Sequence, residues 1–298
     1  MRPAKGADVQ AIADLCNAVG RALYGSDDLT ADEVRTWFAH PDLTMLVAEL
    51  DGRAVGYLDV RRTESGRFPL DIRVHPDAWG TGAEDALVAT GEAWAQARAE
   101  EGDVLRGYAA EPARDLREAL ERAGFRVIRH SFDMAIELDG EPPKPEWPAG
   151  IALRPFRPGV DNEAVYEADM EAFSDHWDFH RTPYEEWRRW NLEGPTHDPS
   201  LFLLAHEGAE LAGICLCQRH RSGDPTWGWV ATLGVRRPWR RRGLGLALLQ
   251  HAFGEFRRRG MSRAGLDVDA ENTTGAVALY ERAGMHVERR RDTLEKAL

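Results

Sequence analysis

The residues with the clearest capacity for chemistry lie in a basic turn near residue 240. Arg240, Gly243 and Gly245 follow the spacing Arg-x-x-Gly-x-Gly, and an apolar run that predicts a helix begins directly after them. Glycine lets the backbone approach a ligand closely and adopt conformations closed to other residues. A helix start offers unbonded N–H groups and a positive dipole end, and arginine adds a forked cation. The turn therefore predicts a phosphate or pyrophosphate site.

Two well-known phosphate motifs do not fit this turn. No Gly-Lys-Ser/Thr follows the glycines, which excludes a Walker loop, and Leu248 stands where the third glycine of a dinucleotide fingerprint belongs. A basic run is also typical of a solvated face, so the turn by itself leaves both interpretations open. A second segment downstream favours the phosphate interpretation.

That second segment, residues 266–285, reads as a strand, a loop around Asn272 and a short helix. Gly284 stands where a helix-ending glycine is expected. Tyr280 lies in the helix, and its apolar neighbours recur at helical spacing, so one helix face is expected in a core. From the residues alone, Tyr280 is either a half-buried core aromatic or a functional group.

In this order and spacing the two segments resemble the GNAT superfamily of acyl-CoA-dependent N-acetyltransferases, over roughly residues 150–298. The resemblance rests on Arg-x-x-Gly-x-Gly before a helix, on the Asn272 loop and on Leu279-Tyr280-Glu281. It implies acetyl-CoA as co-substrate and Tyr280 as the catalytic acid that protonates the departing thiolate. The residues that it assigns to the coenzyme are Leu233, Val235, Arg240, Arg241, Arg242, Gly243, Leu244, Gly245, Leu246 and Asn272.

The general base does not carry over from the family. Many members place a carboxylate on the strand before the turn, whereas this chain has Trp229 at about that position. In this fold the acceptor pocket is lined by a loop that corresponds here to residues 172–184, which is dense in Asp, His and aromatic side chains. The acceptor contacts expected there are Asp175, His176, Trp177 and Asp178, with His176 or His180 as proton acceptor.

Two other interpretations of the acceptor region stay open. Residues 172–184 also read as a surface loop with helix caps, because Thr182, Pro183 and Glu185 look like a helix start. The C-terminal strand offers further candidates for the acceptor site. They are Asp292, Thr293 and Glu295.

The chain of 298 residues reads as two copies of one plan. Residues 46–56 parallel residues 203–213, each as two strands around a turn, and residues 120–125 parallel residues 280–285. The resemblance thus predicts an α/β (α+β) fold of two tandem GNAT domains, each a mixed, mostly antiparallel sheet flanked by helices. We expect domains at 1–138 and 151–298, joined by a proline-rich linker or surface crossing at 139–150.

The N-terminal copy lacks the residues that carry the chemistry. Trp79 stands in the place of Arg240, Glu84 replaces the second glycine and Leu120 replaces the tyrosine. A carboxylate at position 84 would repel a pyrophosphate by about 1 kcal/mol at 4 Å, even with full water screening. The first half is therefore expected to be catalytically silent and a poor coenzyme binder.

Composition narrows the classes of partner, metal and cellular compartment that fit this chain. The net charge of −12 argues against nucleic acid as a partner, and no apolar run approaches a membrane span or a signal peptide. Cys16, Cys215 and Cys217 show no disulfide or zinc pattern, so no metal is expected, and Cys215 and Cys217 should share one strand face. A cytoplasmic, monomeric protein is expected.

The function expected from the resemblance is transfer of an acetyl group from acetyl-CoA to a small-molecule amine by direct attack. The tandem plan is similar to that of mycothiol synthases, so a mycothiol-type precursor is one candidate acceptor and an antibiotic is another. The alternatives are a protein N-acetyltransferase and an acetyl-CoA-sensing or partner-binding module without catalysis. Intact Tyr280 argues against the last, because a sensor need not protonate a thiolate.

Overall fold

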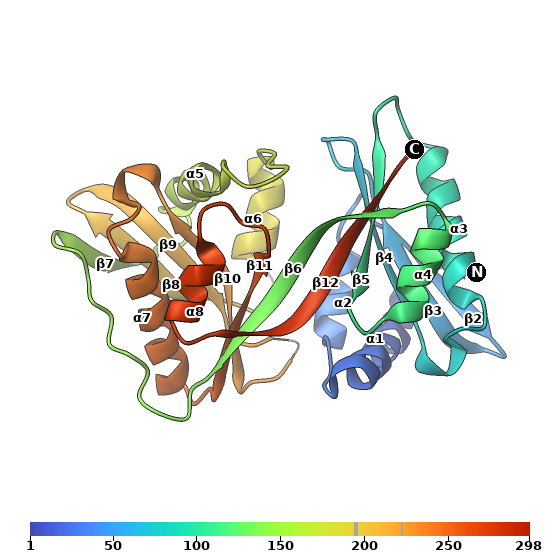
Figure 1. The fold of residues 1–298 in the computed structure, drawn as a ribbon, viewed down its shortest axis with the longest axis horizontal. Coiled ribbons are helices and arrows are strands. Elements are labelled where there is room, and N and C mark those ends of the chain that lie inside the picture. Colours follow the sequence, from blue (N-terminus) through green and yellow to red (C-terminus); the bar gives the residue numbers. More distant parts are fainter. Residues whose placement is uncertain (194–195, 222) are drawn as a thin grey trace. The chain divides into compact units, whose positions relative to one another are not determined.

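The computed structural model describes residues 1–193, 196–221 and 223–298, which form two compact units. Unit 1 comprises Met1–Ser131 and Arg289–Leu298, and unit 2 comprises Phe132–Glu288. Each unit is a mixed sheet with helices on both faces, and most strand pairs are antiparallel (Figure 1). The predicted α/β fold of two tandem domains is confirmed.

Unit 1 holds a sheet in the order β1-β2-β3-β4-β5-β12, in which only β4 and β5 run parallel. The elements are β1 (Arg2–Pro3), η1 (Gly6–Asp8), α1 (Val9–Tyr24), α2 (Ala31–Trp37), β2 (Thr44–Leu50), β3 (Arg53–Val60), β4 (Arg67–Val74), η2 (Pro76–Ala78), α3 (Ala83–Gln96), β5 (Val104–Ala110), α4 (Arg114–Arg122) and the C-terminal strand β12 (His286–Ala297).

Unit 2 repeats this plan with a sheet in the order β6-β11-β10-β9-β8-β7, and β10 and β11 are its parallel pair. The elements are β6 (Arg126–Glu137), β7 (Ile151–Pro155), α5 (Asn162–Phe173), α6 (Tyr184–Leu192), β8 (His197–Glu207), β9 (Glu210–Gln218), β10 (Trp227–Val235), η3 (Arg237–Trp239), α7 (Leu244–Arg258), β11 (Arg263–Asp269) and α8 (Ala276–Arg282).

Alternation along the central strands places two apolar layers on opposite faces of each sheet. On β9, Ile214 and Leu216 pack with α5 and α6, whereas Cys215 and Cys217 pack with α7 and α8. Successive strand residues point to opposite faces, so one strand serves both layers. Both cysteines are buried, free and on the same face, which confirms their predicted packing role.

The two halves of the sequence exchange their last strands. β12 pairs antiparallel with β5, from Arg291 opposite Ala110 to Ala297 opposite Val104, so it completes the sheet of unit 1. The end of β6 completes the sheet of unit 2, where Met134 is fully buried in the core that contains α7. The units therefore divide at 131/132 and 288/289, which differs from the domain limits expected at 138 and 151.

Residues 139–150 contain no helix or strand and run along unit 2. Trp147 packs edge-on against His251 of α7, with ring centroids 5.7 Å apart. The Ala149 carbonyl accepts a bond of 3.3 Å from Arg242. The C-terminal end of this segment is thus attached to unit 2 at Trp147 and Ala149.

Candidate active site

The two parallel strands of unit 2 separate along their length. β10 pairs with β11 only at Trp227, Gly228 and Trp229, but it pairs with β9 as far as Val235. A register shift between Val230 and Thr232 marks a bulge at the point of separation. Bulges redirect a strand and disrupt pairing locally. Beyond Trp229, the β10 edge that faces β11 is therefore open to a ligand that can bond to a strand.

The predicted pyrophosphate turn lies directly after this open edge. α7 starts behind Gly243, which has a φ of 86° and no side chain to cap the helix. Within the described part of the chain, no backbone hydrogen bond is donated by the amides of residues 241–246, whereas the Ala247 amide bonds the Gly243 carbonyl at 3.1 Å. Consecutive unbonded amides at a helix start form an anion-binding site.

Arg240 supports this turn from within. Its Nε donates to the Val235 carbonyl at 3.1 Å and its Nη2 to the Ala172 carbonyl at 2.9 Å. Its Nη1 bonds Asp175 at 2.6 Å. The side chain therefore ties the turn to the end of β10 and to α5, and each guanidinium nitrogen already bonds a protein group. These contacts are structural, and contact of Arg240 with the coenzyme stays a prediction.

Arg242 is also engaged with the protein. Its Nη2 lies 2.7 Å from the Glu207 carboxylate, which also accepts a bond of 2.8 Å from Trp239. The Arg242 hydrogen bond, followed by that of Trp239, holds the pKa of the Glu207 carboxyl below its usual value. Glu207 at the end of β8 thus anchors the far side of the turn. The sequence contains no signal for this role, because its partners lie 32 to 35 residues away.

Arg241 differs from its two neighbours. It adopts a φ of 62°, and among the described residues its side chain makes no hydrogen bond or ion pair. A non-glycine residue in this conformation is uncommon and marks a constrained turn. Arg241 is therefore the arginine of the turn that is most available to an anion.

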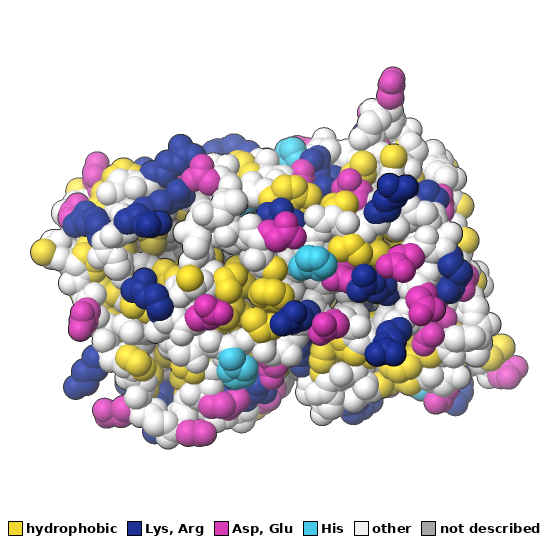
Figure 2. Space-filling model, viewed as in Figure 1, with side chains coloured by type: hydrophobic (Ala, Val, Ile, Leu, Met, Phe, Trp, Pro, Cys, Tyr) yellow, Lys and Arg dark blue, Asp and Glu magenta, His cyan; other side chains and the backbone are white. Residues whose placement is uncertain are grey.

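The surroundings of the turn carry an excess of positive charge. Figure 2 shows Lys and Arg side chains gathered on the part of unit 2 where α5 and the turn before α7 lie, at the upper left of the view. Five arginines here face three carboxylates, so two positive charges are uncompensated. They are Arg236, Arg237, Arg240, Arg241 and Arg242, with Glu171, Asp175 and Glu207.

The two glycines of the motif serve different purposes. Gly243 requires its left-handed conformation, and a Cβ added there would meet nothing within 4 Å. Gly245 has no such conformation, but a Cβ there would lie 3.2 Å from Leu279 of α8. Gly243 thus shapes the turn and leaves space in front of it, while Gly245 lets α8 pack closely on α7.

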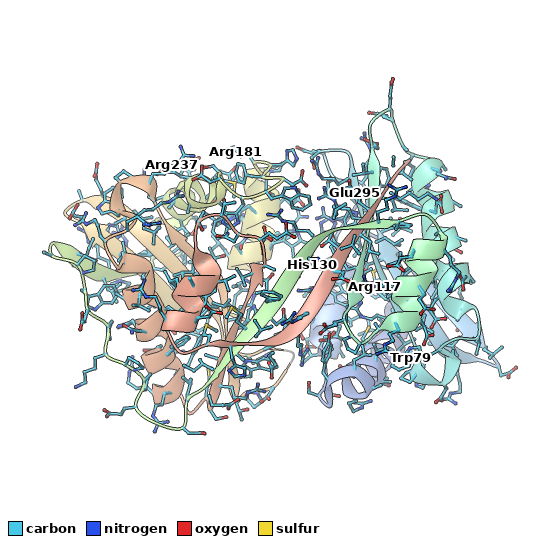
Figure 3. The ribbon with its side chains drawn as sticks, in the orientation of Figure 1. Trp79, Arg117, His130, Arg181, Arg237 and Glu295 are labelled. Atoms are coloured by element: carbon cyan, nitrogen blue, oxygen red, sulfur yellow. The ribbon has the colours of Figure 1, made fainter. Side chains whose placement is uncertain are left out.

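The loop after α5 approaches the turn, as the acceptor prediction requires, but Asp175 points to arginines. Its carboxylate bonds Arg237 and Arg240, each at 2.6 Å. These guanidinium groups, that of Arg240 first, hold the pKa of the Asp175 carboxyl below its usual value. Figure 3 labels Arg237 beside α5. The structure shows Asp175 supporting the turn, and its contact with an acceptor stays a prediction.

His176 lies next to Asn272, and this pairing joins two segments that the sequence analysis treated separately. The His176 Nε2 and the Asn272 Nδ2 are 3.5 Å apart, and the imidazole packs edge-on against Phe173. Burial lowers the pKa of His176, with Asp269 acting in the opposite direction. Asn272 also caps the loop before α8, since its Oδ1 accepts a bond of 2.8 Å from the Thr274 amide. His176 is thus held in its neutral form near the predicted coenzyme site.

The remaining loop residues differ in exposure. Trp177 is 43% exposed, and Asp178 has a φ of 56°. The His180 Nε2 lies 3.4 Å from the Asp178 carboxylate, and the His180 side chain is half exposed. Trp177 and His180 thus lie at the surface, whereas the Asp178 side chain is mostly buried, and their contact with an acceptor stays a prediction.

Tyr280 lies buried in α8, with 8% of its surface exposed. Its hydroxyl makes no hydrogen bond to any residue that the structure describes. Burial raises the pKa of Tyr280, and the Asp267 carboxylate acts in the same direction. The phenol therefore stays protonated at neutral pH, as a proton donor must.

Trp229 fills the strand position at which a carboxylate base was expected and not found. It is 5% exposed, and the Arg221 guanidinium lies 4.2 Å from its ring centre. Asp133 of β6 lies 3.4 Å from Arg221. The position is therefore occupied by a buried aromatic under a cation, and it offers no proton acceptor.

The three candidates on the C-terminal strand belong to unit 1. Asp292 accepts a bond of 2.7 Å from His130 and lies 2.7 Å from Arg117, and Glu295 pairs with Arg106 at 2.7 Å. His130, Arg117 and Glu295 are labelled in Figure 3. Strand exchange therefore brings Asp292, Thr293 and Glu295 into the sheet of unit 1, beside β5.

The comparisons with known proteins agree with this geometry. The model of the acetyltransferase (GNAT) family matches twice, at residues 11–125 and 162–285. The chain belongs to the GNAT acetyltransferase family. It is an acyltransferase with two GNAT domains in tandem.

Several relatives share most of the chain. A mycothiol acetyltransferase from Salinispora arenicola is 34% identical, over 80% of this chain and 77% of its own length. One from Sanguibacter keddieii is 28% identical, over 95% of this chain and 91% of its own. A crystal structure of a GCN5-related N-acetyltransferase from Sphaerobacter thermophilus matches with a TM-score of 0.81 and 38% identity, over 99% of this chain and 94% of that one. A tandem GNAT protein from the clavulanic acid biosynthesis pathway shares the fold, with a TM-score of 0.79 and 20% identity, over 99% and 97%.

The described residues were also searched for a metal site and for a membrane-spanning helix. Within the described ranges, no group of three or more His, Cys, Asp or Glu side chains is arranged to hold a metal ion. No helix in that same part of the chain is long and apolar enough to cross a bilayer.

Proposed function

We propose that unit 2 transfers an acetyl group from acetyl-CoA to the amine of a small molecule. The observation that carries this proposal is the open β10 edge, which ends at a turn with consecutive unbonded amides. A coenzyme that combines an amide-containing arm with a pyrophosphate suits such an arrangement, because strand groups bond amides and a helix start binds phosphate. Backbone groups near Leu233 and Val235 would bond the arm, and residues 241–246 would hold the pyrophosphate.

The reaction is direct attack on the thioester. The neutral amine nitrogen forms a bond to the acetyl carbon, the carbon–sulfur bond breaks, and coenzyme A leaves as a thiolate that must be protonated. The amine gives up a proton to a base, and the transient oxyanion needs a hydrogen-bond donor. Backbone N–H groups beside the bulge of β10 would supply this donor.

Tyr280 is the proposed proton donor to the thiolate. It is protonated, has no protein partner among the described residues and stands in the α8 segment that carries the family pattern Leu279-Tyr280-Glu281. After transfer the tyrosinate would take a proton from solvent. The raised pKa of the phenol favours this reprotonation at equilibrium.

His176 is the proposed base, in preference to His180. Its imidazole is half-buried, and the lowered pKa keeps it unprotonated at pH 7. We expect His176→Gln to lower turnover by about 10- to 100-fold and to remove the acidic limb of the pH–rate profile below pH 6.5. A His176→Gln enzyme with an unchanged profile would assign the proton acceptor elsewhere, and His180→Gln is the matched control.

The relatives named mycothiol acetyltransferase make a mycothiol-type amine the first acceptor to test. The net charge of −12 suits a cationic acceptor, which an amine-bearing antibiotic also supplies. Amines on proteins form a third class. Steady-state turnover with members of the three classes would rank them.

The division of labour between the halves belongs to the same proposal. Unit 1 is proposed to be catalytically silent, because Leu120 takes the tyrosine position and is fully buried. Calorimetric titration of acetyl-CoA into the whole chain tests both statements. We expect one site per chain. Two sites would overturn the silent role of unit 1, and absence of binding would overturn the acetyl-CoA proposal in favour of a module that binds another partner.

A further inference from the structure

The turn before α3 in unit 1 reproduces the backbone of the turn before α7. Gly80 has a φ of 68° and Gly82 a φ of 90°, against 62° for Arg241 and 86° for Gly243. Both helices start behind the second of these residues with no side-chain cap. The positions correspond one to one, with no insertion, so unit 1 retains the conformation that forms an anion site in unit 2.

Trp79 preserves the support of that turn although it replaces Arg240. Its indole Nε1 donates to the Val74 carbonyl at 2.8 Å, as Arg240 Nε donates to the equivalent Val235 carbonyl at 3.1 Å. Trp79 is labelled in Figure 3. Trp79 therefore keeps the hydrogen bond by which Arg240 supports the turn.

Glu84 is where the two turns differ. It takes the place of Gly245 at the second residue of the helix, and only 2% of its surface is exposed. Its Oε1 has no hydrogen-bond partner in the described part of the chain. A buried carboxylate without full compensation is costly, and most proteins avoid it.

The environment of Glu84 shows what the carboxylate faces. Burial raises the pKa of the Glu84 carboxyl, and the backbone amides of Glu84 and Gly80 act in the opposite direction. These amides belong to the turn, at the positions equivalent to Gly245 and Arg241 of unit 2. The nearby Asp115 is exposed, so solvent screens its repulsion.

We propose that residues 79–84 form a second pyrophosphate-binding turn, which the carboxylate of Glu84 occupies in the folded chain. Glu84 is then an internal anion in place of the coenzyme, and unit 1 is silent because its site is filled. This inference rests on the proposed function of residues 241–246, since it takes that turn as the pyrophosphate site. The ligand class is a pyrophosphate, either free or as part of coenzyme A.

Glu84→Gly, which restores the Gly-x-Gly spacing, tests the proposal in the full chain. Calorimetry with acetyl-CoA should change from one site per chain to two, and the affinity of unit 1 for inorganic pyrophosphate should rise by at least about tenfold. Adding Gly243→Glu to this variant should remove the site of unit 2 and leave one. The two ligands separate a site for free pyrophosphate from one that needs the whole coenzyme.

The matched control is Asp85→Asn. Asp85 is the next residue, but its exposed side chain pairs with Arg122 at 2.9 Å outside the turn. The Asp85→Asn substitution removes the same unit of charge as Glu84→Gly, and it should leave one acetyl-CoA site per chain. A gain of a site in Asp85→Asn would show that charge near α3, rather than occupation of the turn, excludes the ligand, and would overturn the proposal.

The remaining outcomes are also decisive. One site in a folded Glu84→Gly chain would overturn the proposal, and Glu84→Ala replaces this variant if the melting transition is lost. Two sites in the unaltered chain would overturn it as well, because Glu84 would then fail to exclude the coenzyme. Absence of binding in the unaltered chain contradicts the proposed function. In that case, a site that appears only in Glu84→Gly would still support the occupied turn, because the variant would have gained it.

Discussion

Arg240 and Arg241 are neighbours with the same charge, but their side chains make different contacts in the structure. Arg240 makes two hydrogen bonds to carbonyls and one ion pair with a partly exposed carboxylate, whereas Arg241 makes none among the described residues. Replacing either by methionine removes one positive charge from the turn. The two variants therefore separate support of the turn from direct attraction of the coenzyme.

The expected loss of stability follows from the contacts. Each hydrogen bond contributes about 0.5 to 1.5 kcal/mol and the partly exposed ion pair about 0.2 to 1 kcal/mol. Arg240→Met should therefore reduce the free energy of unfolding of unit 2 by about 1 to 4 kcal/mol, or several degrees in melting temperature. Arg241→Met should leave the melting temperature unchanged, since its side chain gives up no contact.

Acetyl-CoA affinity supplies the second measurement. Arg241→Met should raise the dissociation constant by about 3- to 10-fold, and added salt should reduce the difference, because the lost interaction is between exposed charges. Differential scanning fluorimetry and calorimetry on both variants suffice. Equal melting temperatures for the two, or an Arg241→Met chain that binds acetyl-CoA normally, would refute the assignment of roles.

Three other predictions concern chemistry, coenzyme binding and pH. Tyr280→Phe should lower turnover by about 10- to 1000-fold with acetyl-CoA affinity unchanged; normal turnover in steady-state assays would remove Tyr280 from the mechanism. Gly243→Glu should abolish acetyl-CoA binding in calorimetry with the fold intact, while Gly82→Glu should have little effect; retained binding in the first would contradict the location of the pyrophosphate. Burial raises the pKa of Asp169 to about 6. Between pH 4 and 6 the folded chain thus holds more protons than the unfolded chain. The free energy of unfolding should therefore fall by up to about 3 kcal/mol as the pH rises from 4 to 6. Asp169→Asn, which can still accept the Trp187 indole bond, should abolish this loss in urea denaturation, and an identical pH dependence in both chains would contradict it.

Local features of the site were accessible from the sequence because they depend on near neighbours. The glycine at position 243 and the helix after it follow from conformational preferences that act within a few residues. The repeat of the strand–turn–strand segments likewise predicted β2 with β3 and β8 with β9, as observed. Alternation in β9 correctly placed Cys215 and Cys217 on one face.

The partners of the charged side chains were not accessible in this way. The sequence shows three arginines in the turn, but only the fold shows that Glu207 and Asp175 engage two of them and leave Arg241. It shows a glutamate at position 84, but not that this side chain lies buried at the start of α3. Long side chains reach whichever partner the packed elements bring near, and that partner is distant in sequence.

The exchange of β6 and β12 is the clearest feature that only the tertiary structure shows. From the sequence we expected a C-terminal strand that carries Asp292, Thr293 and Glu295, and the structure shows it as residues 286–297, with a second long strand at residues 126–137. Nothing in either pattern states which sheet edge each strand joins, because backbone hydrogen bonds are the same for every sequence. The sequence by itself thus determined the family, the two-copy plan and the turn. Only tertiary packing decided which strand completes which sheet and which charges remain free for a ligand.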